Sequence, residues 1–310
     1  MARKALGPAT LAVVQAVDAL PPQPWTVACS GGADSLALAW AASHVAARRG
    51  TPVAALVVDH GLQPGSDVVA ADVVARLASF GLDAVAVRVS VAAGRNLEAA
   101  AREARYAALD AQAGTGAAIL LGHTRDDQAE TVLLGLARGS GPRSLAGMPA
   151  RRGRLVRPLL GLPRRLTSQA CAELGLSPWQ DPMNEDPHYA RVRVRGRVLP
   201  LLERELGPGI AEALARTAGL CRDAADALDA AAAPLAGEPE PDAEALAAAP
   251  AGVRRAALAA WLLGRGAPEA TTAHVAAVEA LVLRWHGQRG VDVPGGTVVR
   301  EDGHLAYVPR

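Results

Sequence analysis

Short apolar runs alternate with longer, periodic segments through the first half of the chain. Four apolar runs predict buried strands, at 25–29, 53–58, 84–89 and 117–122. The segments between them repeat their apolar positions at helical spacing and predict helices at 34–49, 66–80, 97–112 and 127–138. This alternation predicts the α/β fold class: a doubly wound parallel sheet with helices on both faces.

The pattern changes after residue 138. Residues 139–165 are rich in glycine, proline and arginine and have little periodicity, and we expect them to fold over a functional site. Residues 188–206 predict a helix that bridges to the rest of the chain. We therefore place a catalytic domain at 1–200 and a second domain at 207–310.

The second domain is predicted to be smaller and mainly helical. Residues 208–286 are alanine-rich and helical in pattern, interrupted by a loop at 234–241. Short strands follow at 290–300 and 305–308, joined by the turn Asp302-Gly303, which predicts a terminal β-hairpin. Trp261 and Trp285 stand at helical spacing among alanines and are expected in the core.

A glycine turn separates the first predicted strand from the first helix. Its sequence is Ser30-Gly31-Gly32-Ala33-Asp34-Ser35. A strand, a glycine turn and a helix N-terminus together place backbone N–H groups around a phosphate, and Asp34 could hold Mg²⁺. The chain has no GxxxxGK[ST] and its single lysine, Lys4, is distant, so this is no Walker A site. The alternative is an ordinary turn that carries serine and glycine.

A polar string follows the fourth predicted strand. It reads His123-Thr124-Arg125-Asp126-Asp127-Gln128-Ala129-Glu130-Thr131. His123 and Asp127 would lie at the carboxyl end of a strand, where open α/β sheets bind ligands. Capping of the following helix accounts for Asp126 and Glu130, but it does not account for the whole string, which continues to Arg138-Gly139-Ser140-Gly141.

These motifs resemble those of a known family. The glycine turn resembles the SGGxDS loop of the N-type ATP pyrophosphatases, the PP-loop family. The string at 123–141 resembles HxxDDQxET…RGSG of one branch, the tRNA(Ile)-lysidine synthetases. The same branch matches segments at Val57–Leu62 (VDHGL), Asn96–Tyr106 (NxExxARxxRY) and 179–200 (DxxNxD…YxRNxxR…LP). One departure is Val192, which stands where the family has Asn.

The resemblance implies a ligase that joins lysine to carbon 2 of the wobble cytidine of tRNA(Ile) with a CAU anticodon. ATP would adenylate the cytosine O2 and release pyrophosphate, and the lysine amine would then displace AMP. The phosphate loop, Ser30 to Ser35, would bind ATP, with Asp34 holding Mg²⁺. The resemblance also implies four further catalytic residues. His123 would position or polarise the base, and Asp127 would orient or deprotonate the amine. Arg191 and Arg195 would neutralise phosphate charge or bind the tRNA backbone.

The charge distribution fits a nucleic-acid partner. Between residues 138 and 200 twelve arginines face four acidic residues, a balance of +8, whereas residues 201–249 carry a balance of −7. We expect Arg151, Arg152 and Arg154 to be exposed and to contact tRNA. The alternative is a solvated arginine-rich surface.

The remaining features limit other functions. Cys29, Cys171 and Cys221 are isolated, so no zinc or iron–sulfur site is expected, and a tRNA 2-thiolase of the same superfamily would normally need paired cysteines. A non-catalytic nucleotide-binding module would not need His123 and Asp127 together. No apolar stretch is long enough to span a membrane, and the first twenty residues suit an amphipathic helix, so a cytoplasmic protein is expected. A homodimer is left open.

Overall fold

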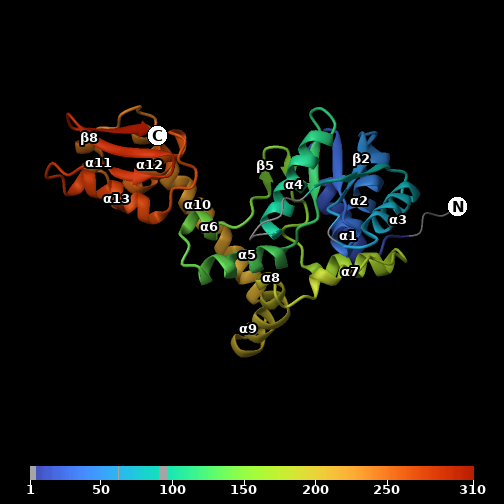
Figure 1. Cartoon of the computed structure of the whole chain (residues 1–310). Coiled ribbons are helices and arrows are strands. Elements are labelled where there is room, and N and C mark those ends of the chain that lie inside the picture. Colours follow the sequence, from blue (N-terminus) through green and yellow to red (C-terminus); the bar gives the residue numbers. More distant parts are fainter. Residues whose placement is uncertain (1–4, 62, 91–96) are drawn as a thin grey trace. The chain divides into compact units, whose positions relative to one another are not determined.

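The chain forms two compact units, Met1–Ala218 and Gly219–Arg310 (Figure 1). This computed structural model describes residues 5–61, 63–90 and 97–310. Two residues of the family-like motifs, Leu62 and Asn96, lie outside the described residues. Helix α10, Ile210–Ala236, runs from the first unit into the second, whereas the sequence placed the division at 200–207.

The first unit is built on a mainly parallel sheet, which confirms the predicted fold class. Its strand order is β3-β2-β1-β4-β6-β5, and only β5 is antiparallel to its neighbour. The strands are β1 (Trp25–Ala28), β2 (Val53–Asp59), β3 (Asp83–Arg88), β4 (Ala118–Leu121), β5 (Arg151–Arg152) and β6 (Leu155–Val156). The order reverses between β1 and β4, and such a switch point is where open α/β sheets bind ligands.

The segment 139–165 contains two strands that the sequence analysis did not predict, β5 and β6. β6 extends the sheet because Leu155 and Val156 pair in parallel with Ile119 and Leu120. The two strands are only two residues each, too short to leave a periodic signal in the sequence.

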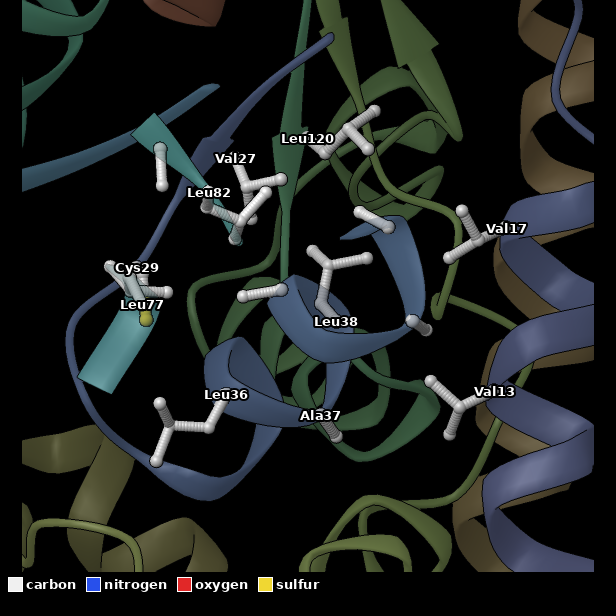
Figure 2. Packing of buried hydrophobic residues seen from close by; sticks show 14 of the residues in the cluster. Val13, Val17, Val27, Cys29, Leu36, Ala37, Leu38, Leu77, Leu82 and Leu120 are labelled. Carbon is white, nitrogen blue, oxygen red and sulfur yellow. The ribbon is translucent and has the colours of Figure 1, made fainter. Parts of the chain in front are cut away.

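Alternating strand residues pack against different helices, as a two-sided sheet requires. Val27 and Leu120 face a core that α1 and α2 cover, with Val13 and Leu36 among the packed side chains (Figure 2). Ile119 and its neighbours on the opposite face pack against α4 in a separate apolar cluster. The helices of this unit before the bridge are α1 (Pro8–Asp18), α2 (Ala33–Arg49), α3 (Ser66–Ser79), α4 (Leu97–Gln112), α5 (Arg125–Ala137), α6 (Pro142–Leu145) and α7 (Arg164–Glu173).

The predicted bridging helix forms a continuous helical run from residue 190 to residue 206. It consists of α8 (Ala190–Arg193), a π-helical turn (Val194–Val198) and α9 (Leu199–Leu206). Single π-helical turns within a helix occur frequently at functional sites. Here the turn carries Arg195.

The second unit is helical and ends in a small antiparallel sheet, as predicted. After α10 it contains α11 (Ala243–Ala248), α12 (Ala251–Gly264), α13 (Thr272–Leu283), β7 (Val291–Val293), β8 (Gly296–Glu301) and β9 (His304–Pro309). The predicted hairpin is one strand larger, because a turn at Pro294 and Gly295 splits 290–300 into β7 and β8. Asp302 and Gly303 both have positive φ in the β8–β9 turn. Trp261 is buried as expected, but Trp285 is 39% exposed, which corrects its placement in the core.

Candidate active site

The phosphate loop leaves β1 and enters α2 with its conformation fixed by one hydroxyl. Ser35 Oγ accepts the Ser30 N–H at 3.2 Å and donates to the Gly32 carbonyl at 3.0 Å. Gly31 has φ +84°, and a Cβ there would lie 2.6 Å from Val73 Cγ2. Glycine is therefore required at Gly31 for both conformation and space. The loop places the first N–H groups of a 17-residue helix at its open end, which suits an anion.

The loop after β4 approaches the phosphate loop closely at a glycine. A Cβ on Gly122 would lie 3.0 Å from the Asp34 carbonyl carbon and from Ser35 N, both backbone atoms. A side chain at Gly122 would push the two loops apart. The sequence analysis did not single out Gly122, although its position at the end of a predicted strand beside His123 was the available signal.

A cleft of about 970 Å³ opens at the switch point. Most of the residues predicted from the sequence line it, and these are Ser30, Gly32, Ala33, Asp34, Ser35, His123, Asp127, Arg191 and Arg195. Gly31 supports the loop from behind by accepting the Trp179 N–H at 3.0 Å. Two elements far apart in the sequence, the β1–α2 and β4–α5 loops, thus form one site.

Asp127 is a buried carboxylate whose two oxygens have different partners. Oδ2 accepts the Thr124 N–H at 2.8 Å and the Thr124 hydroxyl at 2.9 Å. Oδ1 accepts Arg164 Nη2 at 2.6 Å. Burial raises the pKa of Asp127, but Arg164 and the Thr124 N–H outweigh it and hold the pKa below its usual value. Asp127 is therefore ionised and has one oxygen turned to a charged partner in the cleft.

Arg164 is a site residue that the sequence analysis missed. Its guanidinium contacts three carboxylates, with Nε 3.4 Å from Asp34 Oδ2, Nη2 on Asp127 and Nη1 3.1 Å from Glu130 Oε1. These contacts outweigh burial and raise its pKa. Nothing in the sequence separates this arginine from the many others, because its partners come from two segments, α2 and α5, that are distant from it in the chain.

Glu130 corrects the helix-capping interpretation. Thr124 and Asp127 form the cap of α5, whereas Glu130 is fully buried and surrounded by three guanidinium groups. Arg195 Nε lies 2.7 Å from Glu130 Oε1, and Arg191 Nε lies 3.6 Å from Oε2. Glu130 therefore positions Arg191 and Arg195 toward the cleft.

His123 is neutral in this site. Burial lowers its pKa to about 3, against the attraction of Asp127, and Arg105 lowers it further. Its Nδ1 is buried without a hydrogen-bond partner in the described part of the chain. A neutral imidazole can donate from one ring nitrogen and accept at the other, which suits orientation of a base.

Asp34 was predicted to hold Mg²⁺. Burial raises its pKa, opposed by hydrogen bonds from the Thr167 hydroxyl and Arg164. Among the described residues no group of three or more His, Cys, Asp or Glu side chains could hold a metal ion. Mg²⁺ in nucleotide sites, however, usually takes one or two carboxylates with phosphate and water oxygens. Asp34 and Asp127 line the same cleft, so the donor set fits Mg²⁺ that arrives with ATP.

The three arginines predicted to contact tRNA differ from one another. Arg151 and Arg152 form β5 and are exposed. Arg154 instead donates to the carbonyls of Ala117, Ala113 and Gly114 at 3.1, 3.1 and 2.7 Å and pairs with Asp110 at 3.1 Å. The expectation of a free side chain is therefore wrong for Arg154, whose guanidinium binds the C-terminal end of α4.

Comparisons with known proteins agree with this geometry. Residues 9–202 match the PP-loop domain family, and residues 242–306 match the TilS substrate binding domain. The fold also resembles that of the U34-tRNA thiolase NcsA from Methanococcus maripaludis, with a TM-score of 0.54 at 16% identity over 69% of this chain and 80% of that one.

Closer relatives decide between the branches of this fold. The tRNA(Ile)-lysidine synthase of Nocardia farcinica is 54% identical over 90% of each chain. The tRNA(Ile)-lysidine synthase of Leifsonia xyli is 50% identical over 92% of this chain and 89% of the relative. The chain therefore belongs to the tRNA(Ile)-lysidine synthase family, ligases that form a carbon–nitrogen bond.

Proposed function

We propose that the cleft carries out both steps of lysidine formation on the wobble cytidine of tRNA(Ile) with a CAU anticodon. The observation that carries this proposal is the contact of the two loops at Gly122, which puts an anion-binding helix end beside a carboxylate and a neutral imidazole. One pocket can then hold ATP, the base and the amine together, so that their reaction becomes effectively intramolecular.

In the first step the cytosine O2 attacks the α-phosphorus of ATP, and the bond to the β-phosphate breaks to release pyrophosphate. The N–H groups at the start of α2 and the hydroxyl of Ser30 hold the phosphates, and the Ser35 hydroxyl keeps the loop in the conformation that presents them. Asp34 would hold the Mg²⁺ that accompanies ATP, and the ion would supply charge that neutralises the departing pyrophosphate. Arg191 and Arg195, aimed by Glu130, add positive charge on the same side of the cleft.

In the second step the ε-amine of free lysine attacks carbon 2 of the adenylated base and AMP leaves. Asp127 is ionised and reaches the cleft through Oδ1, so it can bind the lysine ammonium and take its proton. His123, neutral and with an unpartnered Nδ1 among the described residues, positions or polarises the adenylated base.

The tRNA is held outside the cleft by exposed arginines and by the second unit. Arg151 and Arg152 form an exposed basic strand, and the domain match at 242–306 supports a substrate-binding role for the second unit.

No helix in the described part of the chain is long and apolar enough to cross a membrane. We place the reaction in the cytoplasm, where ATP, lysine and tRNA meet.

Mass spectrometry of reacted tRNA tests the proposed function. The purified protein, ATP, Mg²⁺ and lysine should add the mass of lysine less water to the CAU-anticodon tRNA(Ile), at the wobble cytidine. A methionine tRNA with the same anticodon is the control and should remain unmodified. Replacement of oxygen by sulfur would indicate a thiolase, and an unchanged mass would indicate a nucleotide-binding module without this activity.

A further inference from the structure

A second group of arginines lies in the cleft, on α4, without carboxylate partners among the described residues. Arg102 and Arg105 line the pocket, and their guanidinium carbons lie 5.1 and 5.4 Å from the centre of the Tyr106 ring. Arg102 is exposed at the rim, whereas Arg105 is half-buried and its Nε has no hydrogen-bond partner in the described part of the chain. A buried guanidinium N–H without an acceptor is costly and indicates a missing ligand.

The contrast with the neighbouring arginines sharpens this indication. Arg164, Arg191 and Arg195 are each paired with Asp127 or Glu130. Neither Arg102 nor Arg105 forms an ion pair among the residues described, and the charged or polar groups with the largest effect on the pKa of Arg105 are Tyr106, Arg102 and Arg191. One side of the cleft is therefore electrically balanced, and the α4 side has uncompensated positive charge. His123 is within electrostatic range of both Asp127 and Arg105.

We infer that Arg105, with Arg102 at the rim, binds a backbone phosphate of the tRNA next to the reacting cytidine. This inference rests on the proposed function. The step from exposed Arg102 to half-buried Arg105 suits a polyanion that enters from solvent, because phosphates along a single strand follow a basic track. A guanidinium also matches the planar pair of oxygens that a phosphodiester presents.

Other anions fit this position less well. The triphosphate of ATP is served by the helix N-terminus of the phosphate loop. The carboxylate of free lysine carries an ammonium on the adjacent carbon, and the guanidinium of Arg102 beside Arg105 would repel that ammonium. A phosphodiester, in contrast, carries a negative charge and no positive charge.

A single neutral linkage in the RNA tests the inference on the unmodified protein. An anticodon stem-loop with a methylphosphonate on either side of the wobble cytidine should lose about ten- to a hundredfold in kcat/KM at one of the two positions, the range for a charge-assisted contact. Arg105→Gln should lose a similar factor with the natural stem-loop. In Arg105→Gln the methylphosphonate should then cost little more, because both changes remove the same interaction.

Arg48→Gln is the matched control, since Arg48 lies at the opposite end of α2, about 20 Å along the helix from the phosphate loop. It should leave the RNA response unchanged. The Kd of ATP and the KM of lysine should stay within about twofold in Arg105→Gln.

Lysidine formation that is insensitive to both methylphosphonates overturns the inference and leaves the proposed function standing. A loss in Arg105→Gln confined to lysine KM or to ATP binding overturns it in favour of a carboxylate or triphosphate site. Failure of the unmodified protein to form lysidine at all rejects the proposed function instead.

Discussion

Arg164 Nη2 lies 2.6 Å from Asp127 Oδ1. The same guanidinium reaches Asp34 on the phosphate-loop side and Glu130 beneath the bridging helix. Arg164 therefore connects the residues assigned to ATP with the residue assigned to the amine. An incoming lysine ammonium must share Asp127 Oδ1 with Arg164 or displace it, so Arg164 sets both the charge state of Asp127 and access to it.

Replacing Arg164 by glutamine should make catalysis sensitive to mild acid. Arg164 holds the pKa of Asp127 below its usual value, so its removal should raise that pKa. The base would then be protonated at higher pH, and the acid limb of the kcat/KM profile should move upward. For each unit by which the pKa of Asp127 rises, the acid limb should move upward by about one pH unit, and activity at a pH on that limb should fall about tenfold. The measurement is lysidine formation from pH 4 to 9.

Arg165→Gln is the control for this prediction. Arg165 is adjacent in α7 but exposed, and it does not line the cleft. The two variants have the same change in net charge, so long-range electrostatics cancel in the comparison. An unmoved acid limb in Arg164→Gln would mean that Asp127 does not depend on this partner.

Most of the fold and part of the site could be predicted from the sequence, because these features depend on local sequence patterns rather than on tertiary contacts. Elements with strong local periodicity, such as 97–112 for α4, match the structure, and the glycine turn and the polar string specify their own loop geometry. β5 and β6 have two residues each, which is too short to show the alternation of apolar and polar positions that predicts a strand. The pairing of Arg164 with Asp127 depends on tertiary structure, because residues 37 positions apart meet only when α7 packs beside the sheet.

Asp34→Ala should abolish ATP-dependent pyrophosphate release without unfolding the protein. Asp34 stands in the first turn of α2 and its carboxylate faces Thr167 and Arg164 rather than the apolar core. Its loss should therefore affect phosphate and Mg²⁺ chemistry more than packing. A pyrophosphate assay with circular dichroism as the folding control checks this. Near-normal release from a folded variant would remove Asp34 from the mechanism.

Asp127→Asn should slow the lysine step more than the adenylation step. Asparagine keeps an acceptor for the Thr124 N–H, so the cap of α5 is largely retained, but the charge that binds the ammonium is removed. Help from a general base is typically worth about 10²–10⁴-fold. Single-turnover assays that follow adenylated tRNA and lysidine separately distinguish the steps. Equal losses in both would assign Asp127 to Mg²⁺ binding.

His123→Gln should reduce turnover without moving the acid limb of kcat/KM. The pKa of His123 is lowered to about 3, so the imidazole is neutral at every pH above about 4 and does not titrate between pH 5 and 8. Because kcat/KM reports ionisations of the free enzyme, the limb should be the same in both proteins. His44→Gln, in α2 and outside the cleft, is the control and should retain full activity. Disappearance of an acid limb in His123→Gln would show that this imidazole is protonated during binding.

The exposed strand β5 should contribute to tRNA affinity, and Arg154 should contribute to stability instead. Arg151→Gln and Arg152→Gln remove charge from exposed side chains, so each should weaken tRNA binding. Each should also lower the slope of log affinity against log salt by about 0.7–0.9 for every phosphate that the protein no longer neutralises. ATP binding should be unaffected.

Arg154→Gln breaks hydrogen bonds to the carbonyls at the end of α4 and to Ala117 beside β4, so its main effect should be a lower melting temperature. Filter binding across a salt series, with thermal unfolding of each variant, separates the two roles. Unchanged affinity and slope in the Arg151 and Arg152 variants would mean that tRNA is held mainly by the second unit, because the β5 charges would then only be solvated.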